Sequence, residues 1–377
     1  MRRAIGHAGA TSGSINVYEV FVSKLFSPMT LRGTTFENRI VVSPMCQYSS
    51  TDGNANDWHV VNLGHFALSG PGLVFFEATH VSPEGRITDR DLGLYSDENE
   101  AAMARVVGFI RTWARSKIGV QLAHAGRKGS TTPPWNGGGP ASGEHAYQTV
   151  APSEIPYSDW PAPNALDAEG LQKIRNDFVA AAKRAQRLDV DVIELHFAHG
   201  YLAHEFLSPL SNRRTDAYGG SLENRLRFPL ELFDAVRAVW PKEKPLGVRI
   251  SATDWVPGGW DVEQSIAFVR ELQKRGCDFV DVSSGGLSPD QKIELGPGYQ
   301  VPFSQAIKQA TGMTTISVGM ITQPMQAEEI VATGQADAVA LARGFIRNPN
   351  WVWDAADALG AESFVPNEYL RGRRLTT

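Results

Sequence analysis

Two histidines and a tyrosine, His196, His199 and Tyr201, directly follow an apolar run in this chain. The run, residues 190–195, is typical of a buried β-strand, and Gly200 permits a turn after it. Imidazole groups at the end of a strand can donate hydrogen bonds to a substrate oxygen, and a neighbouring phenol can deliver a proton. Other interpretations stay open, because His-x-x-His spacing also occurs in metal sites and a histidine at a strand end is often structural.

Eight short apolar segments of this kind alternate with helical segments. The expected strands lie at residues 39–42, 73–78, 118–122, 190–195, 246–250, 279–282, 315–318 and 338–341. Such alternation indicates parallel strands with helical crossovers, and eight units favour a closed (β/α)8 barrel, the TIM barrel of the α/β class. No Gly-x-Gly-x-x-Gly follows the first strand, which counts against an open dinucleotide-binding sheet.

One domain, residues 24–377, is expected to contain the whole barrel and a basic C-terminal tail. Residues 1–23 are rich in Gly, Ser and Ala and predict a flexible N-terminal extension. A small hairpin is expected at residues 31–38. A long loop without periodicity, residues 123–164, follows the third strand, and loops of this length in compact domains are usually functional.

The composition excludes several classes of function. The net charge is -5 with both signs interspersed, so no basic surface for nucleic acid or membrane is indicated. Only two cysteines occur, Cys46 and Cys277. They predict no disulfide framework, favour the reducing cytoplasm, and cannot hold a four-cysteine iron–sulfur cluster.

The ends of the barrel strands are expected to share one face, where the active site of such a barrel lies. Gly319, Ala342 and Arg343 end the last two strands, at the place where barrels bind phosphate, although a tight turn would also require a glycine. Arg249 ends the fifth strand, and no carboxylate to compensate it is evident, so a bound anion is expected. A ligand that meets both features would carry a phosphate at one end and an electron-rich group at the barrel centre. FMN has this shape.

Four longer motifs carry a resemblance to a known family. They are SPMCQY at residues 43–48, QLAHAGRK at 121–128, HFAHGY at 196–201, and SPLSNRRTDAYGGSLENR at 208–225. These stretches resemble the old yellow enzyme family of flavin-dependent ene-reductases, and the similarity extends from about residue 25 to residue 372. Cys46, where other branches carry threonine, resembles the bacterial "thermophilic-like" branch.

The resemblance implies an NAD(P)H-dependent ene-reductase with FMN, in which NADPH or NADH reduces the flavin and an α,β-unsaturated carbonyl compound then accepts the hydride. The residues implied to contact FMN are Ser43, Pro44, Met45, Cys46, Ala78, Gln121, His196, Arg249, Gly319, Ala342 and Arg343. Among them, Cys46 would tune the flavin's potential, Gln121 would bond the pyrimidine, and Arg249 would face N1 and O2.

The resemblance also implies how the substrate is bound. His196 and His199 would hold the carbonyl oxygen, Tyr201 would donate the proton, and Tyr48 would close over the substrate. Arg371 would enter the site of a neighbouring subunit in a homodimer or tetramer. Two departures from the family pattern are Phe197, bulkier than the residue expected between the histidines, and Ala342, which stands where glycine is expected.

Three alternative functions are considered for a barrel with these residues at its strand ends. A dienoyl-CoA reductase or amine dehydrogenase on this barrel would need a cysteine cluster and an added domain. A zinc-dependent hydrolase would use His124, His196 and His199 as ligands, whereas the ene-reductase hypothesis includes no metal. A non-catalytic carrier of flavin or another small ligand is the third.

Overall fold

Eight parallel strands close into a barrel in the computed structural model, which describes residues 22–372. The strands follow one another around the barrel in chain order, and β12 pairs with β3 to close it. Their bounds are β3 (Ile40–Val42), β4 (Leu73–His80), β5 (Lys117–Ala123), β8 (Val192–Phe197), β9 (Leu246–Ser251), β10 (Phe279–Ser283), β11 (Thr315–Val318) and β12 (Ala338–Leu341). The predicted (β/α)8 barrel is therefore confirmed.

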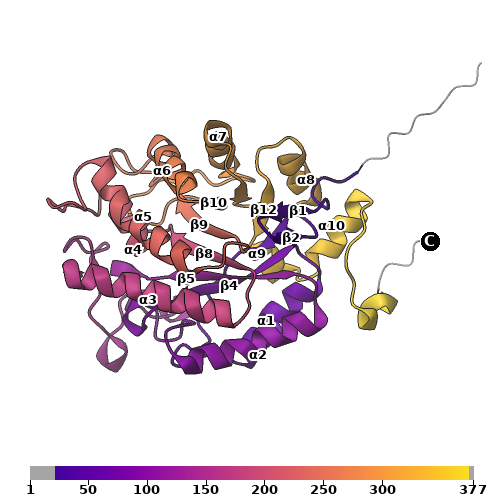
Figure 1. The fold of residues 1–377 in the computed structure, drawn as a ribbon, viewed down its shortest axis with the longest axis horizontal. Coiled ribbons are helices and arrows are strands. Elements are labelled where there is room, and N and C mark those ends of the chain that lie inside the picture. The colour runs from indigo at the N-terminus through magenta and orange to yellow at the C-terminus, as the bar shows by residue number, and fades with distance from the viewer. Residues whose placement is uncertain (1–21, 373–377) are drawn as a thin grey trace, which may run out of the picture.

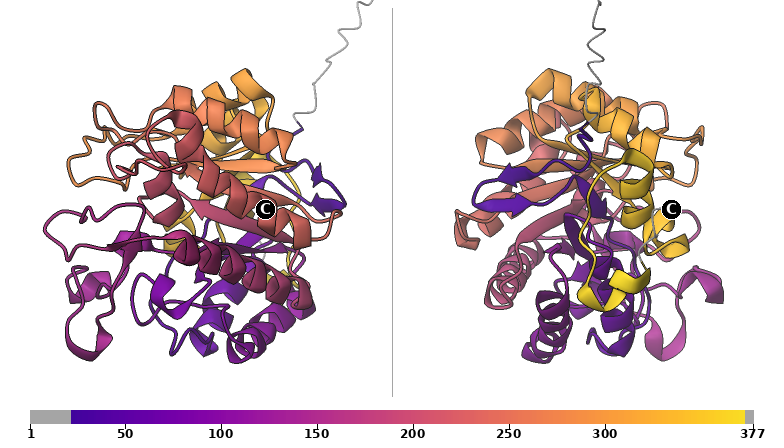
Figure 2. Two further views of the ribbon diagram at one scale, coloured as in Figure 1. Left: turned by 60° about the vertical axis from the view of Figure 1, so that its left-hand side comes forward. Right: turned by 90° about the vertical axis from the view of Figure 1, so that its right-hand side faces the viewer.

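Helices surround the barrel on all sides (Figures 1 and 2). The longer ones are α1 (Asp57–Leu68), α2 (Asp97–Trp113), α3 (Ala168–Arg187), α5 (Leu222–Val239), α6 (Val262–Lys274), α7 (Val301–Thr311), α8 (Pro324–Ala332) and α10 (Trp351–Leu359). Side-chain N-caps explain where several begin: Asp167 accepts a hydrogen bond from the Gly170 N–H, and Asp261 from that of Gln264. Two short helices, α4 (Leu202–Leu207) and α9 (Arg343–Arg347), directly follow β8 and β12.

A hairpin closes the end of the barrel at which the strands begin (Figure 1). It consists of β1 (Met29–Leu31) and β2 (Thr34–Phe36), which pair antiparallel. The hairpin was expected at residues 31–38, so it lies two residues earlier in the chain than predicted. Its apolar side chains pack against the first inward-facing residues of the strands, among them Val41 and Leu73. The hairpin thereby seals this end, and the opposite end remains for a ligand.

The interior of the barrel has an apolar floor beneath a polar layer. Phe75 and Phe279 form part of the floor, and each ring lies over a glycine of a neighbouring strand. A Cβ atom at Gly119 would lie 2.4 Å from the Phe75 ring, and one at Gly247 would lie 2.5 Å from the Phe279 ring. Only glycine therefore fits at these two strand positions, and the next inward residues toward the mouth of the barrel are polar.

The long loop after β5 is held by its own hydrogen bonds. It contains short 3-10 turns and a two-residue parallel pair between β6 (Val150–Ala151) and β7 (Asn164–Ala165). Ser130 anchors it, because the Ser130 carbonyl accepts from the Ala141 N–H and the Ser130 hydroxyl from the Tyr147 N–H. The loop projects beyond the strand ends on the open side of the barrel (Figure 2).

Both ends of the described chain lie against the outer helices. The Ser23 hydroxyl and the Lys24 N–H donate to the Glu328 carboxylate of α8, at 2.6 and 2.8 Å. The tail ends in η5 (Asn367–Gly372), beyond α10. The expectations for residues 1–21 and for the last basic residues concern positions outside those that the structure describes. Within residues 22–372, no helix is long and apolar enough to cross a membrane.

Candidate active site

The end of β8 brings His196, His199 and Tyr201 together, as their spacing predicted. The His196 ring lies 5.1 Å, centroid to centroid, from the ring of His199 and also from that of Tyr201. His199 has a left-handed backbone conformation, with φ of 60°, and its N–H donates to the Ser251 hydroxyl. The three side chains form one cluster at the open end of the barrel.

The turn after His199 depends on a close approach between two loops. A Cβ atom at Gly200 would lie 2.2 Å from the carbonyl oxygen of Gly286 in the loop after β10. Lys128 bridges the same loops, because its Nζ donates to the carbonyl oxygens of His199 and Gly286 at 2.9 and 2.7 Å. The ammonium also lies 5.2 Å from the centroid of the Tyr201 ring. Lys128 thus fixes the backbone that carries the histidines.

The protonation states of this cluster suit hydrogen-bond donation to a carbonyl oxygen. Burial, and then the charge of Arg249, lower the pKa of His196 and of His199 well below the ordinary value of histidine. Both imidazoles are therefore neutral at pH 7. Burial raises the pKa of the Tyr201 phenol well above its ordinary value, so the phenol keeps its proton.

Cys46 and Tyr48 lie on the segment after β3, at the same end of the barrel. Burial, and then the charges of Asp91 and Glu77, raise the pKa of the Cys46 thiol, which is therefore protonated. Tyr48 has a φ of 49°, and its ring meets the Trp135 ring of the long loop edge to face. The aromatic pair covers one side of the mouth.

The carboxylate that holds this segment was not predicted from the sequence. Glu77 accepts a hydrogen bond from the Gln47 N–H at 2.7 Å, and its other oxygen lies 3.2 Å from His59 Nε2. Ala78, an expected flavin contact, follows Glu77 at a register shift in the pairing of β4 with β5. The irregularity at residues 76–78 is not readable from the alternation of apolar residues.

Gln121 and Arg249 belong to one buried polar layer, which also contains Glu194, Asp281 and Ser43. The Gln121 Nε2 donates to Glu194 Oε1 at 2.7 Å, and Arg249 Nε lies 3.3 Å from Asp281 Oδ2. Arg249 Nη1 donates to the hydroxyl of Ser43, 3.2 Å away. The layer joins residues from β5, β8, β9, β10 and the end of β3.

The expectation that Arg249 has no compensating carboxylate is wrong. Asp281 is its direct partner, and the Glu194 carboxyl also interacts with its charge. The alternation of β10, in which Phe279, Asp281 and Ser283 share the inward face, contains the signal that would have found Asp281. Glu194 likewise precedes His196 by two residues on one face of β8. A bound anion is therefore not required to explain the buried arginine.

One cavity of about 780 Å³ extends from the polar layer to the expected phosphate site. Its lining includes Arg249, Ser283, Gln300, Gly319, Ala342 and Arg343. Gly319 has a φ of 128°, and a Cβ atom there would lie 2.8 Å from Gln300 Nε2. Glycine is thus required at the end of β11, whereas Ala342, at the end of β12, has an ordinary negative φ of -108°.

These residues fit an FMN molecule. The cations Arg343 and Arg249 both line the cavity. Three buried polar atoms of the polar layer have no hydrogen-bond partner in the described chain: Glu194 Oε2, Asp281 Oδ1 and Arg249 Nε, whose contact with Asp281 is an ion pair. Pro44 and Met45 are partly buried beside Ser43, above the layer. Arg343 would hold the phosphate, and Arg249 and Gln121 would face the ring.

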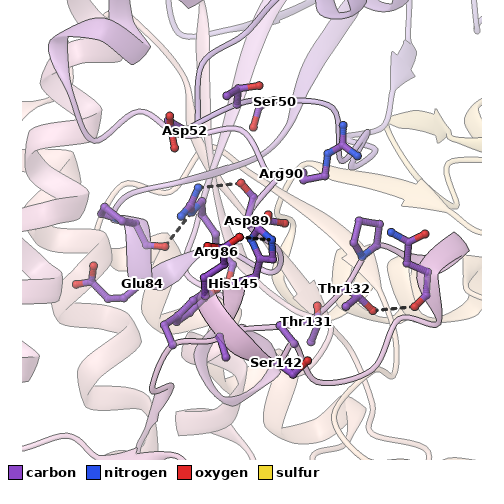
Figure 3. A pocket seen from close by; sticks show the side chains of 18 residues that line it. Ser50, Asp52, Glu84, Arg86, Asp89, Arg90, Thr131, Thr132, Ser142 and His145 are labelled. Atoms are coloured by element: carbon purple, nitrogen blue, oxygen red, sulfur yellow. Dashed lines mark hydrogen bonds and ion pairs between the residues drawn. The ribbon is translucent and has the colours of Figure 1, made fainter.

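A second cavity, of about 910 Å³, lies apart from this site (Figure 3). It is lined by the loops after β3, β4 and β5 and is open and polar. Its central groups pair with one another: Arg86 donates to the carbonyl oxygens of Pro83 and Asp89, and His145 lies 2.9 Å from the Asp89 carboxylate. Within residues 22–372, no group of three His, Cys, Asp or Glu side chains is placed to hold a metal ion.

The barrel and its polar mouth define a flavin-binding oxidoreductase, and the comparisons give the family. Residues 24–362 match the model of the NADH:flavin oxidoreductase / NADH oxidase family. The NADPH dehydrogenase of Geobacillus thermodenitrificans is 44% identical, with 93% of this chain and 98% of the relative covered. That of Bacillus subtilis is 43% identical, with 93% and 99% covered. The chain belongs to this family.

Solved structures agree with this assignment. Morphinone reductase in complex with tetrahydroNAD is 29% identical and superposes with a TM-score of 0.73, covering 91% of this chain and 92% of the other. A 2-naphthoyl-CoA reductase reaches a TM-score of 0.80 at 23% identity and covers 52% of that chain, which shows the fold alone. The resemblance to the old yellow enzyme family is confirmed, and the protein is a flavin-dependent NAD(P)H oxidoreductase with FMN as its cofactor.

Proposed function

We propose that the protein is an ene-reductase, which reduces the C=C bond of α,β-unsaturated carbonyl compounds at the expense of NAD(P)H. The observation that carries this proposal is the cluster of two neutral imidazoles and one protonated phenol at the mouth of an FMN-binding barrel. Bound FMN, once reduced by NAD(P)H, supplies the hydride. The chain's own residues supply the remaining requirements of the reaction.

His196 and His199 bind the carbonyl oxygen of the substrate. Negative charge develops on this oxygen when a hydride adds to the β-carbon, and preorganised donors in a buried site stabilise that charge. The Nδ1 atom of His196 is buried without a partner in the described chain. The Nε2 atom of His199 lies 2.7 Å from the Ser283 hydroxyl, which the substrate oxygen would replace as its partner.

Tyr201 delivers a proton to the α-carbon. Its ring packs edge to face on that of His196, and its raised pKa keeps the proton in place until carbanion character develops on the substrate. Tyr48 would cover the bound substrate, and Cys46, as a neutral thiol, would lie beside the flavin and tune its potential. Lys128 holds His199 and Tyr201 in position through the hydrogen bond to the His199 carbonyl oxygen and the contact with the Tyr201 ring.

We also propose that two subunits share their active sites through Arg371. In the single chain, Arg371 lies exposed at the end of η5, and the described residues offer it no hydrogen bond or ion pair. A guanidinium delivered by a partner would address flavin or substrate oxygens with a permanent charge. We place the protein in the cytoplasm, in keeping with its two free thiols, Cys46 and Cys277.

A single experiment tests the proposed reaction. Protein purified with FMN is supplied with NADPH or NADH and 2-cyclohexenone in the absence of oxygen, and the products are identified by gas chromatography. We expect stoichiometric cyclohexanone. Reduction of the bound flavin by NADPH without any reduction of the enone would leave the family assignment intact and overturn the ene-reductase proposal. A protein without flavin absorbance would favour the zinc hydrolase, and bound flavin without any turnover would favour the carrier.

A further inference from the structure

A pair of carboxylates lies in the barrel interior, in the layer that would face the flavin's pyrimidine ring. Glu194 of β8 and Asp281 of β10 flank Arg249 of β9, and the three side chains are 0%, 1% and 6% exposed. Two carboxylates and one guanidinium would carry a net charge of -1 if all were ionised. Such a charge beneath the flavin would oppose its reduction, because reduction adds negative charge to the ring.

The contacts of the two carboxylates differ, and they show which one carries a charge. Asp281 Oδ2 lies 3.3 Å from Arg249 Nε, so Asp281 has a cationic partner. Glu194 Oε1 accepts from the neutral amide of Gln121, and Glu194 Oε2 has no partner in the described chain. A buried charge without a cationic partner is far more costly than a paired one. The geometry therefore assigns the charge to Asp281 and a proton to Glu194.

The pKa values agree with this geometry. Burial, and then the charge of Asp281, raise the pKa of Glu194 to about 8. Burial also raises the pKa of Asp281, while Arg249 acts to lower it. At pH 7 the two carboxyl groups then hold one proton between them. The charges of Glu194, Asp281 and Arg249 therefore sum to zero.

We propose that Asp281 and Glu194 are positioning residues that set the reduction potential of the flavin. Asp281 is the charged counter-ion that cancels the charge of Arg249. Glu194 is the neutral group that fixes the orientation of the Gln121 amide. The proposal rests on the proposed placement of Arg249 and Gln121 at the flavin ring. Because the amide nitrogen of Gln121 points to Glu194, its carbonyl oxygen is free to accept the flavin's N3–H. Arg249 without Asp281 would attract the reduced ring more strongly.

The test measures the reduction potential of bound FMN in Asp281→Asn and Glu194→Gln holoenzymes, by equilibrium titration against a reference dye. Asp281→Asn removes a charge from almost the same volume. We expect it to strengthen the binding of reduced relative to oxidised FMN by tenfold or more, which raises the potential by ~30 mV for a two-electron couple. Glu194→Gln replaces a neutral group by another, and we expect a shift several times smaller.

Glu328→Gln serves as the matched control. Glu328 is also a buried carboxylate, but it lies on α8 and accepts hydrogen bonds from the N–H groups of Lys24 and Leu25 outside the barrel. Its replacement is expected to lower the melting temperature without moving the potential. If the reduction potential changed by the same amount in Asp281→Asn, Glu194→Gln and Glu328→Gln, a general loss of stability would account for the change. This outcome would overturn the proposal.

A second measurement does not depend on the folding of the Asp281 variant. Redox-induced infrared difference spectra of the wild type are expected to show the C=O stretch of a protonated carboxylic acid, which disappears in Glu194→Gln and persists in Glu328→Gln. Absence of this band, or an unchanged potential in a flavin-bound Asp281→Asn protein, would overturn the proposal. Both measurements use bound FMN without substrate. The proposal about Asp281 and Glu194 can therefore be wrong while the protein reduces enones, and it can be right while the protein does not.

Discussion

His199 combines a strained backbone with a neutral imidazole, and it is the residue at which the proposed binding of the carbonyl oxygen is tested most directly. Replacing His199 with alanine removes one donor to the developing negative charge. Loss of one such donor costs roughly 2.7–4 kcal/mol in comparable sites. We expect rapid-mixing kinetics to show enone reduction slowed about 10²–10³-fold, with flavin reduction by NADPH much less affected. His199→Asn keeps a donor and should recover part of the rate; an unchanged oxidative half-reaction in the alanine variant would remove His199 from the mechanism.

Tyr201 offers a separate test, because it is proposed to act on a different atom of the substrate. In Tyr201→Phe the ring packing against His196 is kept and only the proton donor is lost. General acid catalysis typically supplies 10²–10⁴-fold, so enone reduction is expected to slow by about that order. Binding of the enone to the oxidised enzyme, followed by flavin absorbance, should be preserved. Wild-type turnover of 2-cyclohexenone by this variant would contradict the assignment.

At the scale of elements, the loops after β8 and β10 determine whether the histidines are in place. Gly200→Ala introduces a Cβ atom 2.2 Å from the Gly286 carbonyl oxygen and also strains a backbone with φ of 73°. Gly220 is a matched control, because its φ is 81° and a Cβ atom there meets nothing within 4 Å. Gly220→Ala should cost only the left-handed strain, roughly 1–2 kcal/mol, and leave activity unchanged.

We expect Gly200→Ala to be less stable than Gly220→Ala and to lose enone turnover, because the backbone of His199 has to move. Thermal unfolding and steady-state kinetics on the two variants give the comparison. Equal melting temperatures and equal activities would show that the approach of the two loops is not required.

Elements with strong local signals were predictable from the sequence. β11 and β12 were predicted with the same bounds that the structure shows, because each is a short run between a helical segment and a turn that contains glycine or alanine. α9 was missed, since five residues directly after β12 give no helical period to detect. The existence of the hairpin and of the long loop followed from glycine and proline in their usual turn positions.

The candidate site was predictable where the family motifs cover it. Outside those motifs, only some of its residues were predicted. The three strand-end residues converge as their spacing predicted, whereas Glu194, Asp281 and Glu77 were overlooked. Each lies inside a strand that was interpreted as an apolar run, and which side chains face the barrel interior depends on the register of eight strands. Register is set by pairing between segments far apart in the chain, so a single segment does not contain that information.

At the scale of the whole molecule, a cavity joins the polar layer to the cation Arg343. The C-terminal tail, as far as residue 372, takes no part in closing the barrel. η5 contains no buried residue, and its Tyr369 packs edge to face on Trp353 of α10, with ring centroids 6.0 Å apart. Tyr369 and Leu370 remain about half exposed, at 46% and 51%. Two apolar side chains on an otherwise exposed tail suit a surface that a second subunit covers.

The tail is therefore where the proposed dimer can be tested. Truncation after Pro366 removes none of the buried residues that the structure describes, so the barrel should fold and retain FMN, while the dimer weakens and the Michaelis constant for an enone rises. Arg371→Ala in the full chain should raise the Michaelis constant without weakening the dimer, because it removes only the group proposed to enter the partner's site. Light scattering and steady-state kinetics on both proteins separate the two effects. A full-length monomer with full activity, or a truncated protein unchanged in both quantities, would show that each barrel works alone.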